Sequence, residues 1–191
     1  MLFLLGINHG LQIPIGTKNS FYSDSQKKEF QKYLIERVLT LNNITFFAEE
    51  FSNDQKQIKN IKDTLIEELV FFLNTKIMTK LEHSFIEPSI FEQLKLGIET
   101  PKQIQKRIKL PVVNPSKEKV EEYNLELRKH FPARENYWLS ILQPKIDNHK
   151  NGIVVIGLGH VESFSKLLQS KGIDYSLFCF VSNPTHISRT E

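Results

Sequence analysis

Two short motifs of the form Gly-x-x-His stand near the two ends of the chain. They read Gly6-Ile7-Asn8-His9 and Gly157-Leu158-Gly159-His160. Each follows an apolar run typical of a buried β-strand, so each histidine is expected where a strand ends. A neutral imidazole at that position can bind a metal ion or relay a proton near neutral pH. One such histidine more often only caps a helix or bonds a loop, but two matching turns make a shared site an equally good interpretation.

Carboxylates are expected at two further strand ends. Glu49 and Glu50 follow the apolar segment 44–48, and Glu87 follows a weaker predicted strand over residues 76–86. A carboxylate near histidines supplies a hard metal ligand or a general base. Because surface glutamates are also common after strands, the sequence favours a functional role for Glu49 and leaves the roles of Glu50 and Glu87 open.

A third candidate is the pair Arg134-Glu135, at the start of a predicted helix. The planar guanidinium of Arg134 can clamp a carboxylate, a phosphate or a developing oxyanion. Glu135 suits the positive end of a helix even without a catalytic role. Trp138, the only tryptophan, is interpreted as a core residue. The other histidines lack a comparable context and are interpreted as structural or surface residues: His83, His130, His149 and His186.

These residues need a fold that brings the two ends of the chain together. Continuous apolar runs predict strands at residues 2–7, 44–48, 152–157 and 175–181. Apolar residues at three- and four-residue steps predict helices at residues 25–41, 53–73, 134–142 and 161–169. Alternating strands and helices predict an α/β fold with an open, largely parallel sheet flanked by helices. The site is then expected at the carboxyl ends of the strands.

The middle of the chain, about residues 89–130, is predicted to be helical and polar. Pro101, Pro111 and Pro115 divide it into pieces. It is too polar to build a core of its own, so we interpret it as a helical lid inserted into a single domain of residues 1–191.

Composition narrows the classes of protein. Of the 191 residues, 40% are hydrophobic and 25% charged, which suits a chain with a sizeable core. A net charge of +3 is far from the basic footprint of a nucleic-acid binder, so no nucleic-acid partner is expected. A single cysteine, Cys179, excludes an internal disulfide and a cysteine-based zinc cluster. The apolar start is too short for a membrane span and lacks the basic flank of a signal peptide, so we expect no membrane contact and a cytoplasmic location.

Together, His9, Glu49, Arg134 and His160 resemble the pattern of the TraB/TIKI superfamily, which includes ChaN-like haem-binding and erythromycin-esterase-like proteins. That pattern has an early and a late Gly-x-x-His motif, a glutamate after the second strand, and an arginine in a helix start shortly before the late motif. Residues 130–173 carry the more specific match. The chain is shorter than the well-known members, and its helical middle has no counterpart in a characterised one.

The resemblance implies a site more firmly than a reaction. TIKI-type members look like metal-dependent peptidases, erythromycin-esterase-like members hydrolyse esters with a histidine base and no metal, and TraB-type members have regulatory roles. The first hypothesis is therefore a metal-assisted hydrolase acting on a small molecule or a peptide. In it, His9, Glu49 and His160 would hold a divalent metal such as manganese or zinc, which activates a water molecule.

In the same hypothesis Arg134 steadies the oxyanion, and Glu50, Glu135 and Glu162 are the candidates for moving protons. A second hypothesis keeps the hydrolase without the metal and uses a histidine or a glutamate as general base on water. A third is a non-catalytic or regulatory protein whose crevice binds a small anionic or haem-like ligand.

Overall fold

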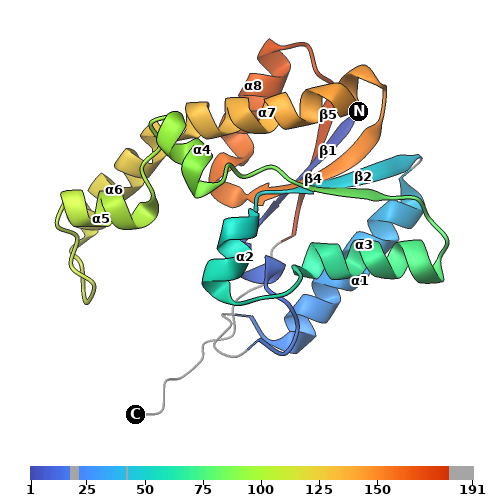
Figure 1. The fold of residues 1–191 in the computed structure, drawn as a ribbon, viewed down its shortest axis with the longest axis horizontal. Helices are drawn as coiled ribbons and strands as arrows, with labels where there is room; N and C mark the ends of the chain where they lie inside the picture. The colour runs from blue at the N-terminus through green and yellow to red at the C-terminus, as the bar shows by residue number, and fades with distance from the viewer. Residues whose placement is uncertain (18–21, 42, 181–191) are drawn as a thin grey trace.

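The computed structural model describes residues 1–17, 22–41 and 43–180. Within these residues five parallel strands form one open sheet in the order β3-β2-β4-β1-β5. The expected α/β class is confirmed (Figure 1). The strands are β1 (Leu2–Ile7), β2 (Ile44–Glu49), β3 (Glu82–Phe85), β4 (Asn151–Gly157) and β5 (Tyr175–Cys179).

Helices cover both faces of this sheet and close a separate core on each. Helices α1 (Asp24–Thr40) and α3 (Leu65–Lys76) pack on one face. Helices α7 (Phe131–Asp147) and α8 (Val161–Ser170) pack on the other (Figure 1). No helix in the described ranges combines the length and apolar character needed to cross a membrane.

Side chains of β2 alternate between the two cores, because successive residues of a strand point to opposite faces. Phe46 and Ala48 belong to the core under α7 and α8, whereas Phe47 belongs to the core under α1 and α3. The same alternation directs Glu49 and Glu50 to opposite faces of the sheet.

The two strands that carry the Gly-x-x-His motifs are neighbours at a topological switch point. β1 pairs with β4 in parallel, with Ile7 opposite Gly157. The chain leaves β1 toward α1 on one face and leaves β4 toward α8 on the other. Such a divergence opens a crevice at the carboxyl ends of the two strands. Since β2 pairs with the other edge of β4, its end joins the same crevice.

Two expected elements differ from the structure. The single helix predicted over residues 53–73 is two helices, α2 (Asn53–Lys59) and α3, each started by its own capping box. Asn60 separates them with φ at 51°, a left-handed conformation that asparagine tolerates better than most residues. The strand predicted over residues 76–86 shortens to β3, because α3 continues to Lys76. Residue 181 of the last predicted strand and His186 lie outside the described residues.

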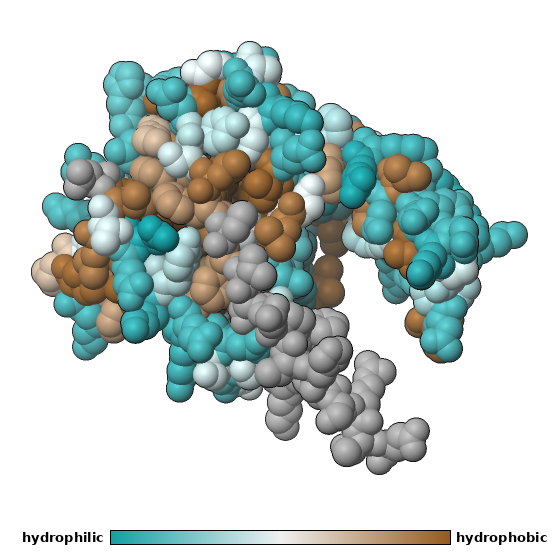
Figure 2. All heavy atoms as spheres, turned by 180° about the vertical axis from the view of Figure 1, so that it is seen from behind, coloured by the Kyte–Doolittle hydropathy of each residue, from teal (hydrophilic) through white to brown (hydrophobic). Residues whose placement is uncertain are grey.

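The middle of the chain forms an arm of three short helices beside the sheet. These are α4 (Ile90–Lys95), α5 (Pro101–Arg107) and α6 (Lys117–Lys129). The helices α5 and α6 project from the main body in Figure 1, and Figure 2 shows a mostly hydrophilic lobe set apart by an open gap. None of the residues of α6 is buried, in keeping with a segment too polar to build its own core.

Edge strand β3 is tied to the rest of the molecule through Glu82. Its carboxylate accepts hydrogen bonds from Lys145, at 2.7 Å, and from Lys150. These two bonds hold the pKa of Glu82 at about 2, below its ordinary 4.5. A depressed folded-state pKa stabilises the fold above the unfolded-state value, and that contribution is lost as the pH falls toward 2.

Glu82→Gln should therefore destabilise the protein at pH 7 and have a shrinking effect between pH 4.5 and pH 2. Because the side chain is half-exposed, the loss at pH 7 should stay below about 1 kcal/mol. Urea unfolding of both proteins across this range measures it. An equal loss at pH 7 and pH 2.5 would contradict the assignment of the stabilisation to the ionised carboxylate.

Candidate functional site

The ends of β1, β2 and β4 bring three side chains to one point. Nε2 of His9 and Nε2 of His160 each lie 3.5 Å from the same atom, Oε1 of Glu50. The other oxygen of Glu50 accepts a hydrogen bond from the backbone N–H of Gly157 at 2.7 Å. His160 and Glu50 are buried, while the side chain of His9 is 48% exposed. The two motifs therefore meet across one buried carboxylate.

The first glycine of each motif makes room for the other motif. A Cβ on Gly157 would collide with the ring of His9. A Cβ on Gly6 would lie 2.5 Å from Cγ2 of Val161, the residue after His160. The spacing Gly-x-x-His thus has a packing reason: each glycine lets the opposite strand end approach closely.

The ring of His160 is oriented by a carboxylate. Nδ1 of His160 lies 2.8 Å from Oε1 of Glu135, which is buried beside it on α7. Since an ionised carboxylate only accepts hydrogen bonds, Nδ1 carries the proton of the neutral ring. Its Nε2, with a free lone pair, then faces Glu50. The rings of Phe131 and Trp138 hold His160 on two sides, with ring centroids 3.7 and 4.7 Å away.

The ring of His9 is oriented through an amide. Nδ1 of His9 lies 2.9 Å from Oε1 of Gln12, whose Nε2 donates to Glu49 at 3.0 Å. Because the Gln12 nitrogen is committed to Glu49, its oxygen must be the acceptor for His9. The neutral ring of His9 therefore also turns the lone pair of its Nε2 toward Glu50.

Glu49 is not the carboxylate that the histidines share, contrary to its sequence-based choice as a metal ligand. It is fully buried on the opposite face, where its carboxylate is bonded by Gln12, by Thr64 Oγ1 at 2.5 Å and by His83 Nε2 at 2.7 Å. The alternation of β2 is the reason: a shift of one residue changes the face. Glu49 reaches the site only through Gln12, and His83 is its partner rather than a surface residue.

Arg134 lies between two carboxylates at the edge of the site. Its Nη2 is 2.8 Å from Oε1 of Glu50 and 2.9 Å from Oε2 of Glu87. Trp138 Nε1 also donates to Glu87, at 3.2 Å. The guanidinium that was expected to clamp an oxyanion is here bonded to two buried acids. The sequence left the role of Glu87 open; in the structure its carboxylate is the second partner of Arg134.

These contacts decide which groups are charged. Burial by itself raises the pKa of Glu50, but His9, Arg134, His160 and the N–H of Gly157 outweigh it and lower the pKa below its ordinary value. Burial raises the pKa of Glu87 despite the nearby Arg134. For Arg134, the carboxylates of Glu87 and Glu50 more than offset burial and raise the pKa, so it stays protonated. The site keeps Glu50 as an anion.

Glu162, a sequence-based candidate for proton transfer, lies outside this group. Its side chain is 82% exposed and pairs with Lys166 at 2.6 Å on the surface of α8. It does not line the hollow next to the histidines. Glu162 points away from His160, because residues two apart on a helix do not share a face.

The histidines open into a hollow of about 610 Å³ between the sheet end and the arm. One wall comes from α2 and the segment before it, and another from α6, so the inserted arm borders the cleft. Its walls combine apolar and polar side chains, among them Phe51, Gln55, Lys59, Asn124, Leu127, Arg128, Phe131 and Leu158.

The expected metal ligands are not assembled. Within the described residues no group of three or more His, Cys, Asp or Glu side chains is arranged to hold a metal ion. Glu49 lies on the wrong face, and Oε1 of Glu50, its replacement, already accepts a hydrogen bond from Arg134. A cation bound by His9, Glu50 and His160 would have to compete with that guanidinium.

Comparison of the chain with protein-family models, with curated proteins and with solved structures found no match. Its resemblance to the TraB/TIKI superfamily therefore stays a prediction that rests on the residues of the two motifs and the helix start.

The contact between Gly157 and His9 generates a first prediction for the site. Gly157→Ala should displace the His9 ring, because a Cβ would occupy its position, and should weaken the coupling of His9 to Glu50. NMR titration of the His9 ring, beside thermal unfolding, measures both effects. Gly159→Ala is the matched control, since its Cβ would meet only Phe131 at an ordinary 3.8 Å. Unchanged His9 signals in Gly157→Ala would contradict the packing explanation.

Arg134→Met should be strongly destabilising, because it leaves Glu50 and Glu87 buried without their shared cation. Breaking a buried pair in this way costs about 3–5 kcal/mol. Arg134→Lys, which keeps the charge but not the fork, should lose less. Arg107→Met is the control: it removes exposed pairs with Glu99 and Glu126 and should cost much less. An equal loss of unfolding free energy in Arg134→Met and Arg107→Met, measured in urea, would contradict a stabilising role of Arg134.

Proposed function

We propose that this protein is a hydrolase in which His160 is the general base toward a water molecule held between the two histidines and Glu50. The observation that supports this most is the geometry of His160. Its Nδ1 is bound by Glu135 at 2.8 Å, and its Nε2 is directed at Glu50 at the wall of an open hollow. A carboxylate that fixes the tautomer of an imidazole and leaves its Nε2 free forms the dyad that activates water or a hydroxyl in many hydrolases.

Each partner has a part in the proton transfer. Nε2 of His160 takes the proton of the attacking water, and the ring becomes an imidazolium. Glu135 on Nδ1 and Glu50, 3.5 Å from Nε2, both stabilise that positive charge. Base catalysis of this kind contributes about 10²–10⁴ to the rate.

His9 supplies the matching acid. Its Nε2 lies as close to Glu50 as that of His160, and its Nδ1 is held by Gln12. Because His9 is half-exposed, it exchanges protons with bulk water and, once protonated, donates to the leaving group. Glu50 stabilises the protonated form of either ring, so one carboxylate serves the acid and the base.

A metal-assisted hydrolase is the second candidate, and one distance favours it. Two ligand atoms of a tetrahedral zinc site lie about 3.3 Å apart, close to the 3.5 Å between each Nε2 and Oε1 of Glu50. The Nδ1 partners, Glu135 and Gln12, are of the kind that orient metal-bound histidines. Manganese or zinc held by His9, Glu50 and His160 would lower the pKa of a bound water and polarise a substrate carbonyl.

The test is hydrolysis of a panel of 4-nitrophenyl carboxylic esters, phosphate esters and anilides by protein treated with a chelator. We expect turnover to persist, and His160→Gln and Glu135→Gln each to lower kcat/KM by about 100-fold or more. Glu162→Gln, which tests the sequence-based assignment, should keep the wild-type rate. Circular dichroism and thermal unfolding check that each variant is folded.

Two results would change the conclusion. Loss of activity on chelation, its return with manganese or zinc, and stoichiometric metal by elemental analysis would select the metal-assisted candidate. No turnover of any ester, phosphate ester or anilide, with or without metal, would contradict a hydrolase.

A further inference from the structure

Two cations in the walls of the hollow have no carboxylate partner among the residues that the structure describes. Lys59 is the last residue of α2, and Arg128 comes from the end of α6. Both line the hollow that contains His9 and His160. In residues 1–17, 22–41 and 43–180, no carboxylate oxygen comes within 4.0 Å of either cation.

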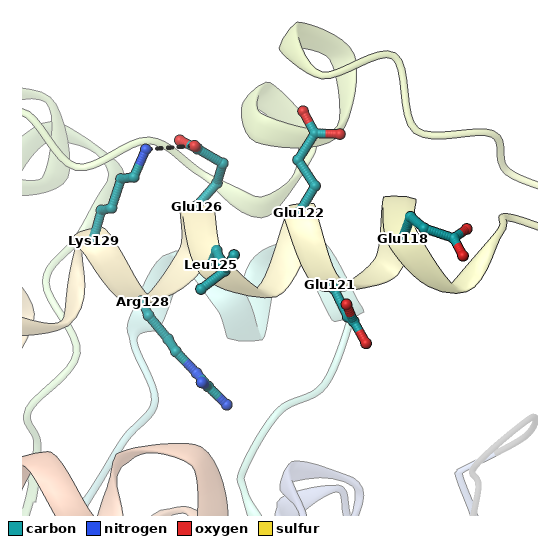
Figure 3. A pocket seen from close by; sticks show the side chains of 7 residues that line it. All are labelled: Glu118, Glu121, Glu122, Leu125, Glu126, Arg128 and Lys129. Atoms are coloured by element: carbon teal, nitrogen blue, oxygen red, sulfur yellow. Dashed lines mark hydrogen bonds and ion pairs between the residues drawn. The ribbon is translucent and has the colours of Figure 1, made fainter.

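Two nearby cations of the arm, Lys129 and Arg107, have carboxylate partners. Lys129, the neighbour of Arg128, contacts Glu126 at 2.5 Å, and Arg107 contacts Glu99 at 2.7 Å. Figure 3 shows Lys129 and Glu126 on one side of α6 and Arg128 extending from the opposite side. Arg128 acts on Glu162 only at longer range, as the weakest of the influences that lower the pKa of Glu162, of which Lys166 is the first.

The charge of the hollow is therefore out of balance. Among the described residues that line the hollow, Glu50 is the one acid, against Lys59, Arg128 and Arg134. Arg134 is neutralised by Glu50 and by Glu87, which lies behind the wall. The positive charge that remains is that of Lys59 and Arg128, which both line the hollow. A cleft of one charge sign attracts ligands of the other.

Polar and apolar neighbours complete the setting of these cations. Oε1 of Gln55 is occupied by the N–H of Ser52 at 3.0 Å, so the amide nitrogen of Gln55 is left as its donor. Nζ of Lys59 lies 5.1 Å from the ring centroid of Phe51. Phe51 and Leu127 reduce the water around the charges, which strengthens their attraction for an anion.

We propose that the hollow binds a substrate with a carboxylate or phosphate group, held between Lys59 and Arg128 while its scissile bond lies at the two histidines. The position of the scissile bond rests on the proposed hydrolase function, whereas the binding of the anion does not. Arg128 provides a planar fork that matches either anion in two parallel hydrogen bonds, and Lys59 adds a mobile point charge from the other wall.

The experiment compares a neutral ester, 4-nitrophenyl butyrate, with its anionic counterpart, mono-4-nitrophenyl glutarate. It is run on the wild type, on the double variant Lys59→Gln/Arg128→Gln and on the control Lys129→Gln. We expect kcat/KM of the wild type to be about tenfold or more higher for the anionic ester, because one charge-assisted hydrogen bond contributes about that much. The double variant should lose this preference, and Lys129→Gln should keep it.

Binding is measured separately, by calorimetry and by the fluorescence of Trp138, with glutarate and with inorganic phosphate as probes. Tighter binding of one probe identifies the carboxylate or the phosphate as the preferred group, and both should weaken by about tenfold in the double variant. Anion binding that depends on Lys59 and Arg128 in a protein without hydrolytic activity would retain this inference and refute the proposed hydrolase. Hydrolysis with equal ester preference in wild type and double variant would overturn the inference alone, and so would the absence of anion binding in an inactive protein.

Discussion

The buried carboxylate of Glu50 is the group on which the rest of the site depends. An ionised carboxylate without partners is costly to bury, so every polar group around it has a reason to be where it is. Arg134 and the N–H of Gly157 bond it directly, and His9 and His160 approach the same oxygen from two sides. These partners come from three separate segments of the chain. Their shared need for one anion ties the early and late parts of the sequence together at the sheet end.

The sheet order makes this convergence possible. β4 lies between β1 and β2, so the ends of the three strands that carry the site are adjacent although the chain visits them in a different order. The glycines at positions 6 and 157 allow these ends to approach, each by leaving out a side chain where the other motif must pass. The divergence of α1 and α8 to opposite faces then leaves the crevice open above them.

Support for the two histidines is unequal, and the difference suits different roles. His160 is buried, packed between two aromatic rings and bonded directly by Glu135. His9 is half-exposed and reaches Glu49 only through Gln12. A ring fixed by a carboxylate is preorganised to take a proton, whereas a ring in contact with solvent can be reprotonated between turnovers. The arm adds a further wall, which includes Arg128.

The sequence alone determined the class of fold and the positions of the main strands, because apolar periodicity is a local signal. It also offered a shared site for the two Gly-x-x-His turns as one of two equal interpretations. It did not determine which of two adjacent glutamates serves the histidines. That choice depends on which face of β2 meets α7 and α8, a fact of packing that no local pattern contains. Likewise, Arg134 reads as a free clamp until Glu87, distant in sequence, is seen beside it. Tertiary structure decided these points because the partners of a buried charge are chosen across elements, not along the chain.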